Sequence, residues 1–124
     1  MAYSFIIKRR NSFRNALRGI AAILRSQVNF RIHLAVLVLV ILAGVFFRIT
    51  SSDWMVVILA GGLVLTAEGL NTALEFICNA VSMEENPHLR TAKDAAAGGV
   101  LLAAIAAASA GLMIFIPHLL SFLE

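Results

Sequence analysis

Residues 54–80 read WMVVILAGGLVLTAEGLNTALEFICNA, an apolar run with strongly polar side chains in its second half. About 20 consecutive apolar residues suffice for a helix to cross a bilayer, so this run is long enough to span a membrane. Trp54 at its start is typical of the interface between lipid and water. Glu68, Asn71 and Glu75 lie where hydrocarbon is expected, and a carboxylate there is costly unless it is solvated or paired. These polar side chains therefore need an explanation.

Apolar runs also lie on both sides of this one, and they predict membrane spans over 32–49 and 94–116. The turn around Thr50–Asp53 is very short, so the first two spans should form an antiparallel hairpin. Residues 82–93, SMEENPHLRTAK, are polar and include Pro87, which predicts a cytoplasmic loop before the third span.

The third span shows signals for its start, its packing and its end. TAKD at 91–94 resembles a capping box with Asp in place of Glu, which predicts a helix start near Thr91, and Pro117 fits the end of the helix. Small residues let helices approach closely in lipid, so a stripe of them predicts that this span packs against protein. The stripe recurs every four residues, at Ala95, Gly99, Ala103, Ala107 and Gly111.

The N-terminal segment 10–27 has the period of an amphipathic helix. Its apolar stripe consists of Phe13, Leu17, Ile20 and Leu24, and the flank beside the stripe carries Arg14, Arg18 and Arg25. A basic amphipathic helix next to a membrane span is typical of a segment that lies in the bilayer interface, with arginines near phosphate head groups.

Charge and composition narrow the class of protein. The 124-residue chain is 60% hydrophobic, well above the roughly 45–50% of a soluble domain. No Asp or Glu precedes Asp53, whereas most of the basic residues do. The positive-inside rule then predicts a cytoplasmic N-terminus and an external C-terminus. Because the basic segment lacks interleaved aromatic residues and runs into a membrane span, nucleic acid is not an expected partner.

The expected fold is all-α and integral to the membrane. One membrane domain, 1–124, should hold three transmembrane helices over 32–49, 54–80 and 94–116 and an N-terminal amphipathic interfacial helix. Cys78 is the only cysteine, so no disulfide framework is expected, and the histidines are too scattered to indicate a metal cluster.

The polar residues of the second span share one helix face. Glu68, Asn71 and Glu75 stand at i, i+3 and i+7, which is about 60° of azimuth, and the stripe points toward Lys93 and Asp94. Phosphoryl transfer uses such groups: carboxylates hold Mg²⁺ on phosphates, a lysine neutralises charge, and another carboxylate takes the proton of a hydroxyl.

A purely structural role for the stripe is an open alternative at this stage. Glu and Asn side chains on a buried helix face can hydrogen-bond between helices, and Lys93 can serve only as a positive-inside charge. Neither GxxxxGK[ST] nor GxGxxG occurs in the chain, so none of the usual nucleotide motifs is present. The residues alone predict a polar membrane site that is open to the cytoplasm.

Four blocks of sequence resemble a known family. They are AEGLNTALE at 67–75, AKDAAAGGVL at 92–101, NFRIH at 29–33 and ALRGI at 16–20, with the family's spacing between them. The chain thereby resembles the small bacterial integral-membrane lipid kinases, which include prokaryotic diacylglycerol kinase and undecaprenol kinase. The resemblance implies a homotrimer in the bacterial inner membrane that moves the γ-phosphoryl group of Mg²⁺-ATP to the terminal hydroxyl of diacylglycerol or undecaprenol.

The resemblance also implies roles for individual residues. Glu68 falls on the general base that acts on the lipid hydroxyl, and Asn71 on a polar catalytic residue beside it. Glu75 falls on a carboxylate that binds Mg²⁺. Lys93 and Asp94 fall on a pair that contacts the nucleotide. The remaining nucleotide and lipid contacts implied by the match are Lys8, where the family has arginine, Asn29, Phe30 and Arg31.

The chain departs from the family pattern at two places. A second metal-binding Glu of the family is replaced by Gln27, which puts metal affinity in question. The loop often reads E-Y-H in the family, but this chain has Glu84, Glu85 and Asn86, so recognition of the adenine base is in question. The alternatives to a lipid kinase are an inactive relative of the kinases and a non-catalytic membrane protein, such as an assembly factor or transporter subunit.

Overall fold

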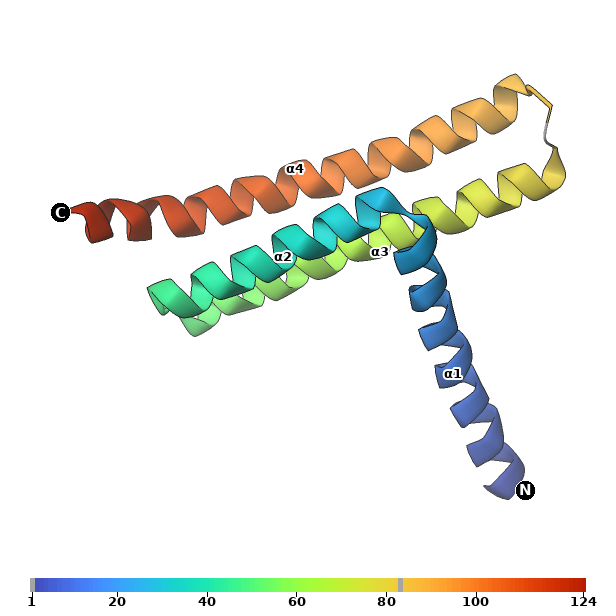
Figure 1. The fold of residues 1–124 in the computed structure, drawn as a ribbon, viewed down its shortest axis with the longest axis horizontal. Helices are drawn as coiled ribbons and strands as arrows, with labels where there is room; N and C mark the ends of the chain where they lie inside the picture. The colour runs from blue at the N-terminus through green and yellow to red at the C-terminus, as the bar shows by residue number, and fades with distance from the viewer. Residues whose placement is uncertain (1, 83) are drawn as a thin grey trace.

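The computed structural model describes residues 2–82 and 84–124, and the regular elements in them are all α-helices (Figure 1). They are α1 (Ala2–Ser26), α2 (Val28–Phe47), α3 (Ser51–Val81) and α4 (Pro87–Leu123). Helices α2 and α3 form an antiparallel hairpin, and α4 runs back along α3, whereas α1 projects away from the other three (Figure 1). Helices α2, α3 and α4 are long and apolar enough to cross a membrane.

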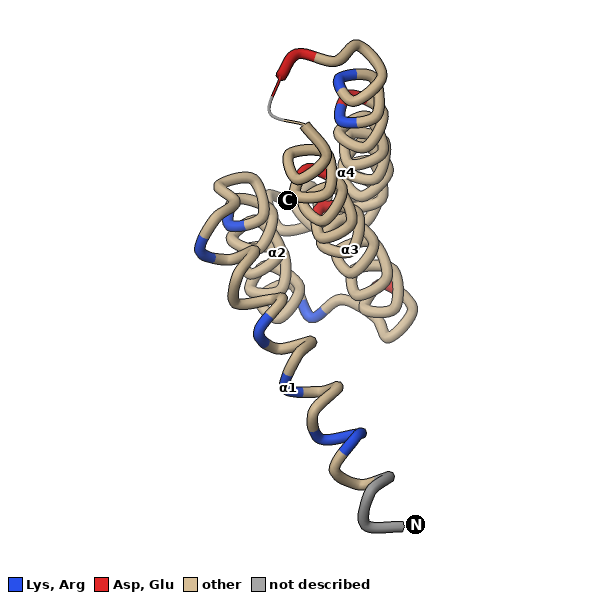
Figure 2. Tube along the Cα trace, turned by 90° about the vertical axis from the view of Figure 1, so that its right-hand side faces the viewer, with Lys and Arg blue, Asp and Glu red and all other residues tan. Residues whose placement is uncertain are grey.

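The first helix is longer than the sequence predicted. We expected it over 10–27, but α1 begins at Ala2 because residues 2–9 contain neither Gly nor Pro to interrupt the helix. It ends before Gln27, whose backbone is extended (φ −109°, ψ 116°), and this single residue turns the chain into α2. Basic residues follow one another along α1 (Figure 2), and Phe13 and Leu17 are exposed. A position in the bilayer interface stays a prediction.

The hairpin of α2 and α3 also begins and ends elsewhere than expected. The predicted span 32–49 is helical over 28–47, because Gln27 fixes the start and Arg48 adopts a left-handed conformation (φ 52°, ψ 48°) that ends the helix. The predicted span 54–80 is helical over 51–81, because Thr50 caps α3. The side chain of Thr50 accepts a hydrogen bond from the Asp53 N–H at 3.2 Å, and Asp53 Oδ2 accepts one from the Thr50 N–H at 3.1 Å.

The helix of the third span begins earlier than its predicted start near Thr91. The expected capping box at Thr91–Asp94 does not begin the helix, and residues 87–93 of the expected loop 82–93 belong to α4. Asn86 is the N-cap, since its Oδ1 accepts hydrogen bonds from the N–H groups of His88 and Leu89 at 2.9 and 3.4 Å. Pro87 occupies the first helical position, where its missing N–H costs nothing.

The expected end of this helix at Pro117 was wrong, because α4 continues through Pro117 to Leu123. A proline inside a helix costs about 3 kcal/mol, so other contacts must hold this turn. The ring of Phe47 on α2 lies 6.2 Å from each of the rings of Phe115, His118 and Phe122. Aromatic pairs contribute about 0.5–1.5 kcal/mol each beyond their buried area, which offsets the effect of the proline.

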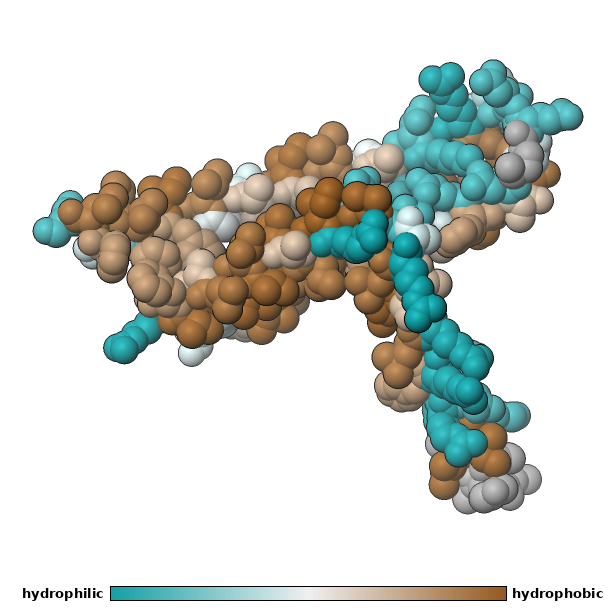
Figure 3. Space-filling view, viewed as in Figure 1, coloured by the Kyte–Doolittle hydropathy of each residue, from teal (hydrophilic) through white to brown (hydrophobic). Residues whose placement is uncertain are grey.

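The small core of the chain lies next to these rings. Ile49, Val57 and Ile114 are buried there, against partly buried neighbours that include Trp54 and Phe47. Gly44 allows a close approach here, since a Cβ at this position would lie 2.9 Å from the Trp54 ring. Most other apolar side chains are exposed, and they cover the surface shown in Figure 3 away from the polar end.

The small-residue stripe of α4 is only partly covered within one chain. Ala103 is buried, while Ala95 and Gly99 are exposed. A stripe with a period of four drifts around a helix that has 3.6 residues per turn, so its two ends face different directions. Packing of Ala95 and Gly99 against another protein surface stays a prediction.

Candidate functional site

Polar side chains form a row along α3, on the face where the α1–α2 junction meets the bundle. Glu68, Glu75 and Asn79 mark three successive levels of this row, because about 10 Å of helix separates the first two and about 6 Å the last two. Each level has its own polar partner: His33 from α2, Gln27 from the junction and Lys93 from α4. The row begins among apolar helices and ends at the polar tip formed by α3 and α4 (Figure 3).

The first level is buried. Glu68 is 3% exposed, and its Oε1 lies 3.4 Å from the Nε2 of His33. Thr72, which is 1% exposed, donates its hydroxyl to the backbone carbonyl of Glu68 at 2.9 Å. The Thr72 hydroxyl therefore bonds to the helix backbone, and the contact to the Glu68 carboxylate comes from His33.

The second level surrounds Glu75 with amides. Asn71 Nδ2 donates to Glu75 Oε1 at 3.4 Å, and Gln27 Nε2 donates to Glu75 Oε2 at 3.5 Å. Both contacts are at the long end of hydrogen bonding. Among the described side chains, Asn71 Oδ1 is buried without a hydrogen-bond partner. A buried oxygen of this kind indicates a missing donor or cation, because an unpaired buried acceptor is costly.

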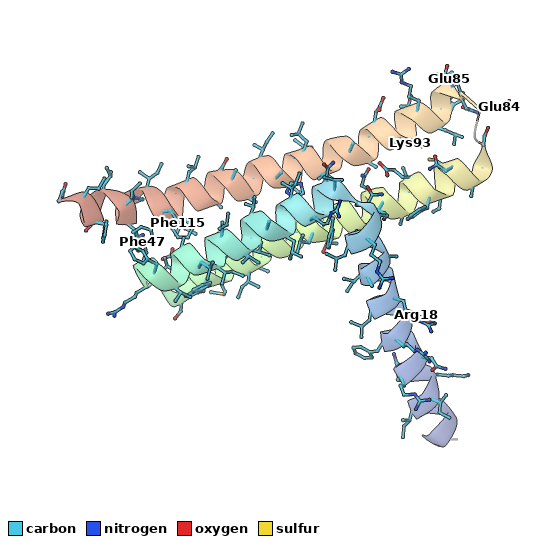
Figure 4. The ribbon with its side chains drawn as sticks, viewed as in Figure 1. Arg18, Phe47, Glu84, Glu85, Lys93 and Phe115 are labelled. Carbon is cyan, nitrogen blue, oxygen red and sulfur yellow. The ribbon has the colours of Figure 1, made fainter. Side chains whose placement is uncertain are left out.

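The third level opens to the polar end of the molecule. Lys93 Nζ donates to Asn79 Oδ1 at 2.7 Å and so connects α4 to α3. A groove of about 650 Å³ lies here, between the last turn of α3 and the first turns of α4. Figure 4 shows Lys93 on the side of α4 that faces α3, and Glu84 and Glu85 beyond it on the connecting segment. The groove is lined by Asn79, Ser82, Glu84, Glu85, Asn86, Pro87, Leu89, Arg90 and Lys93.

An apolar cleft lies on the other side of the Glu68 level. It has a volume of about 410 Å³ and is walled by α2, α3 and α4. Its walls are almost entirely aliphatic, with Val36, Val64 and Ala107 among them, and His33 is the polar residue in its lining. His33 therefore lines the apolar cleft and also contacts the buried carboxylate of Glu68, the first level of the polar row.

Some of the residues singled out from the sequence lie apart from this row. Lys8 is exposed on α1, roughly 27 Å of helix away from the junction. Asp94 is exposed on the first turns of α4, and Asn29 and Arg31 are exposed at the start of α2. Phe30 is 7% exposed and packs in the interior. The single chain thus brings together the residues of α3, the junction and the groove, but not Lys8.

Sequence reasoning missed His33 and Asn79. The three histidines are scattered along the chain and indicate no metal cluster, but a polar ring inside an apolar span is a signal that the sequence offers for His33. Asn79 continues the spacing of the stripe, four residues after Glu75, and could have been found from that period. Arg90, which lines the groove, precedes Lys93 by one turn of α4.

The donor atoms at the second level can be compared with the needs of Mg²⁺. Among the described residues, no three His, Cys, Asp or Glu side chains converge on one point. Glu75 is the carboxylate at this level, and the unpaired Oδ1 of Asn71 is a neutral oxygen beside it. Mg²⁺ prefers oxygen ligands and is often held by one or two carboxylates together with substrate phosphates and water. The residues fit an ion that arrives with phosphates, rather than a cage made of protein alone.

Comparisons of the chain with a family model and with curated proteins agree on one family. A family model described as prokaryotic diacylglycerol kinase matches residues 14–115. An undecaprenol kinase from Bacillus subtilis is 40% identical over 58 residues, which are 47% of this chain and 47% of that protein. A diacylglycerol kinase from Synechocystis sp. is 47% identical over 62 residues, 49% of this chain and 35% of that protein. The chain thus matches about half or less of the length of these curated relatives.

The family match covers the N-terminal helix from Arg14, the α1–α2 junction, the whole of α3 and α4 as far as Phe115. Every level of the polar row falls within it, as do the groove and the apolar cleft. The chain therefore belongs to the prokaryotic diacylglycerol kinase family.

Proposed function

We propose that the protein is an ATP-dependent lipid kinase of the bacterial cytoplasmic membrane, which transfers the γ-phosphoryl group to the terminal hydroxyl of a membrane lipid. The two curated relatives are named as kinases of diacylglycerol and of undecaprenol, and both lipids are candidates here. The observation that carries the proposal is the polar row of α3, which joins a buried carboxylate beside an apolar cleft to a polar groove. A lipid and a water-soluble nucleotide approach from these two different environments.

The groove suits the nucleotide. Lys93 and Arg90 supply positive charge to phosphates, and Asn79 holds the Lys93 ammonium toward the α3 side of the groove. Glu84, Glu85 and Asn86 would lie near the base or ribose, where they offer hydrogen-bond acceptors in place of an aromatic ring. Asp94 completes the nucleotide set of the family pattern from the exposed side of α4.

The second level suits a metal ion that accompanies the phosphates. Glu75, Asn71 and Gln27 would hold Mg²⁺ through their side-chain oxygens, and the ion would neutralise charge on the transferring phosphoryl group. Gln27 now donates its amide to Glu75, so its side chain must rotate to present its carbonyl oxygen. This requirement predicts a weaker ion site than two carboxylates would make.

The first level suits proton transfer. Glu68 would accept the proton of the lipid hydroxyl as that oxygen attacks the γ-phosphorus, and the oxygen of the ADP leaving group takes the electron pair of the broken P–O bond. Because Glu68 is 3% exposed, bulk water competes poorly with the lipid hydroxyl for this position. Asn71, one turn away on α3, would orient the attacking hydroxyl or the phosphoryl oxygens.

We propose further that the active form is a homotrimer with the N-terminus and the groove on the cytoplasmic side. In a single chain Lys8 lies far from the groove, so a contribution from Lys8 to nucleotide binding requires another subunit. The exposed small residues of α4 offer a surface on which a second subunit can approach closely. Asn29, Phe30 and Arg31, next to the junction, would meet the head group of the lipid.

The test is an assay in mixed micelles with the purified protein. Diacylglycerol and undecaprenol are supplied side by side, with Mg²⁺ and ATP labelled in its γ-phosphate. We expect label in the organic-extractable fraction with at least one lipid, and none when the lipid or the Mg²⁺ is omitted. The absence of transfer to both lipids, in micelles where a known diacylglycerol kinase is active, would overturn the proposal and favour a structural role for the polar row.

A further inference from the structure

We propose that His33 is a positioning residue for Glu68: its Nε2–H donates a hydrogen bond to Oε1, so that Oε2 is held ready for the lipid hydroxyl. The inference rests on the proposed kinase function and adds a residue to it. It starts from one contact, the 3.4 Å separation between His33 Nε2 and Glu68 Oε1 across α2 and α3.

The Thr72 hydroxyl and the Asn71 amide, two donors near Glu68, make other hydrogen bonds. Thr72 donates its hydroxyl to the Glu68 backbone carbonyl at 2.9 Å, and the Asn71 amide donates to Glu75. Across the described residues, His33 is therefore the side chain that makes a polar contact with the Glu68 carboxylate. A carboxylate that is 3% exposed needs a hydrogen-bond donor to hold it in one direction, because a buried polar group without a partner is costly.

The position of the His33 ring in the apolar cleft is a second, independent observation. His33 also lines the apolar cleft, and its side chain is 26% exposed. The ring thus stands between the buried carboxylate and the space from which an apolar chain would arrive. A leucine at this position would fill similar volume in the cleft but could not donate to Glu68, which separates the packing role from the hydrogen-bonding role.

The positioning role predicts which kinetic constant changes. If the Nε2–H orients Glu68, its loss acts on proton transfer and lowers kcat, while the ATP groove on the far side of Glu75 is untouched. A hydrogen bond to a charged group corresponds to about a tenfold to hundredfold effect on rate. A role in packing alone would instead lower the yield of folded protein and leave kcat per folded molecule unchanged.

The experiment compares four variants in the mixed-micelle assay. His33→Leu removes the donor, His33→Asn keeps an amide that is too short to reach Glu68, and His33→Gln places an amide N–H near the position of Nε2. His118→Leu is the matched control. His118 lies beside Phe47 near the C-terminal end of α4, away from Glu68 and from the groove. Helical content and size in detergent are measured for each variant before its kinetics.

We expect kcat to fall about tenfold to hundredfold in His33→Leu and His33→Asn, with the ATP KM close to that of the unchanged protein. His33→Gln should recover most of the loss, and His118→Leu should show none. Unchanged kcat in folded His33→Leu, or a loss in His33→Gln as large as in His33→Asn, would overturn the inference while the kinase function stands. If His33→Leu does not fold, the comparison of Gln with Asn decides. If the protein without any substitution transfers no phosphate to either lipid, the kinase proposal itself is overturned, and this inference with it.

Discussion

The two ends of the hairpin of α2 and α3 differ in how completely their groups are satisfied. At the Thr50 end there are a reciprocal capping box, ring contacts around Phe47 and a buried Ile49. At the Gln27 end, the contacts among the described residues give Glu75 two long hydrogen bonds and leave Asn71 Oδ1 without one. The first end secures the fold, whereas the second keeps polar atoms available to a ligand. Stability and function are thereby separated along one pair of helices.

The largest expected contrast between the two ends is their accessibility from the two sides of a membrane. Single cysteines at Ser52 and at Ser82, each in a Cys78→Ala background, should react with an impermeant thiol reagent from opposite sides of sealed vesicles. The reason is that α3 is long enough to carry its two ends to different faces. Reaction of both cysteines from the same side would exclude a membrane-spanning α3.

The next largest effect is the fall in kcat that we expect when Glu68, the buried carboxylate of the polar end, is replaced. Glu68→Gln keeps the shape of the side chain but cannot accept a proton, so kcat should fall by about two to four orders of magnitude. The apparent affinity for ATP should change little, since the groove lies beyond Glu75. Glu124→Gln, at the exposed C-terminal end of α4, serves as a control that removes the same charge away from the polar row and the groove. Turnover by Glu68→Gln at the rate of the unchanged protein would show that Glu68 only joins helices.

A smaller effect, on stability alone, is expected at the apolar end. In Gly44→Ala the new Cβ would lie 2.9 Å from the Trp54 ring and 3.0 Å from Ile49, so the free energy of unfolding should fall by about 1–3 kcal/mol. Gly62→Ala is the matched control, because a Cβ there meets nothing within 4 Å. The measurement is the thermal midpoint of both variants in one detergent. Equal midpoints would mean that the packing at this end is looser than the structure indicates.

The smallest expected effect concerns the ion at the polar end. Gln27→Glu brings a second carboxylate to Glu75, so the Mg²⁺ concentration for half-maximal rate should fall several-fold. Combined with Glu75→Gln the change should be non-additive, because two ligands of one ion are coupled. Ser26→Glu, which adds the same charge on the preceding exposed residue, should not reproduce the effect. An unaltered Mg²⁺ dependence in Gln27→Glu would remove the metal interpretation of this position.

Sequence reasoning predicted the helices and the polar stripe, because hydrophobic period and length are local properties. It misplaced the start and end of α4, where Asn86 and packing against Phe47 outweigh the signals of Thr91 and Pro117. The pairs His33–Glu68 and Lys93–Asn79 were not predictable, since each joins two helices whose mutual rotation is set by packing. The contact between Gln27 and Glu75 was expected only from the family pattern, and the structure brings the two side chains together.

The extended backbone of Gln27 has a geometric consequence for the whole chain. Helix α1 has 25 residues, or about 37 Å of length, and the chain passes from it into α2 through this one extended residue (Figure 1). A rotation of about 10° at such a pivot moves the far end of α1 by about 6 Å, while the pivot itself hardly moves. With α1 in the bilayer interface, as the sequence predicts, we expect a hinge at Gln27 to let the helix follow a bilayer that thins, thickens or curves, while the Gln27 side chain stays near Glu75.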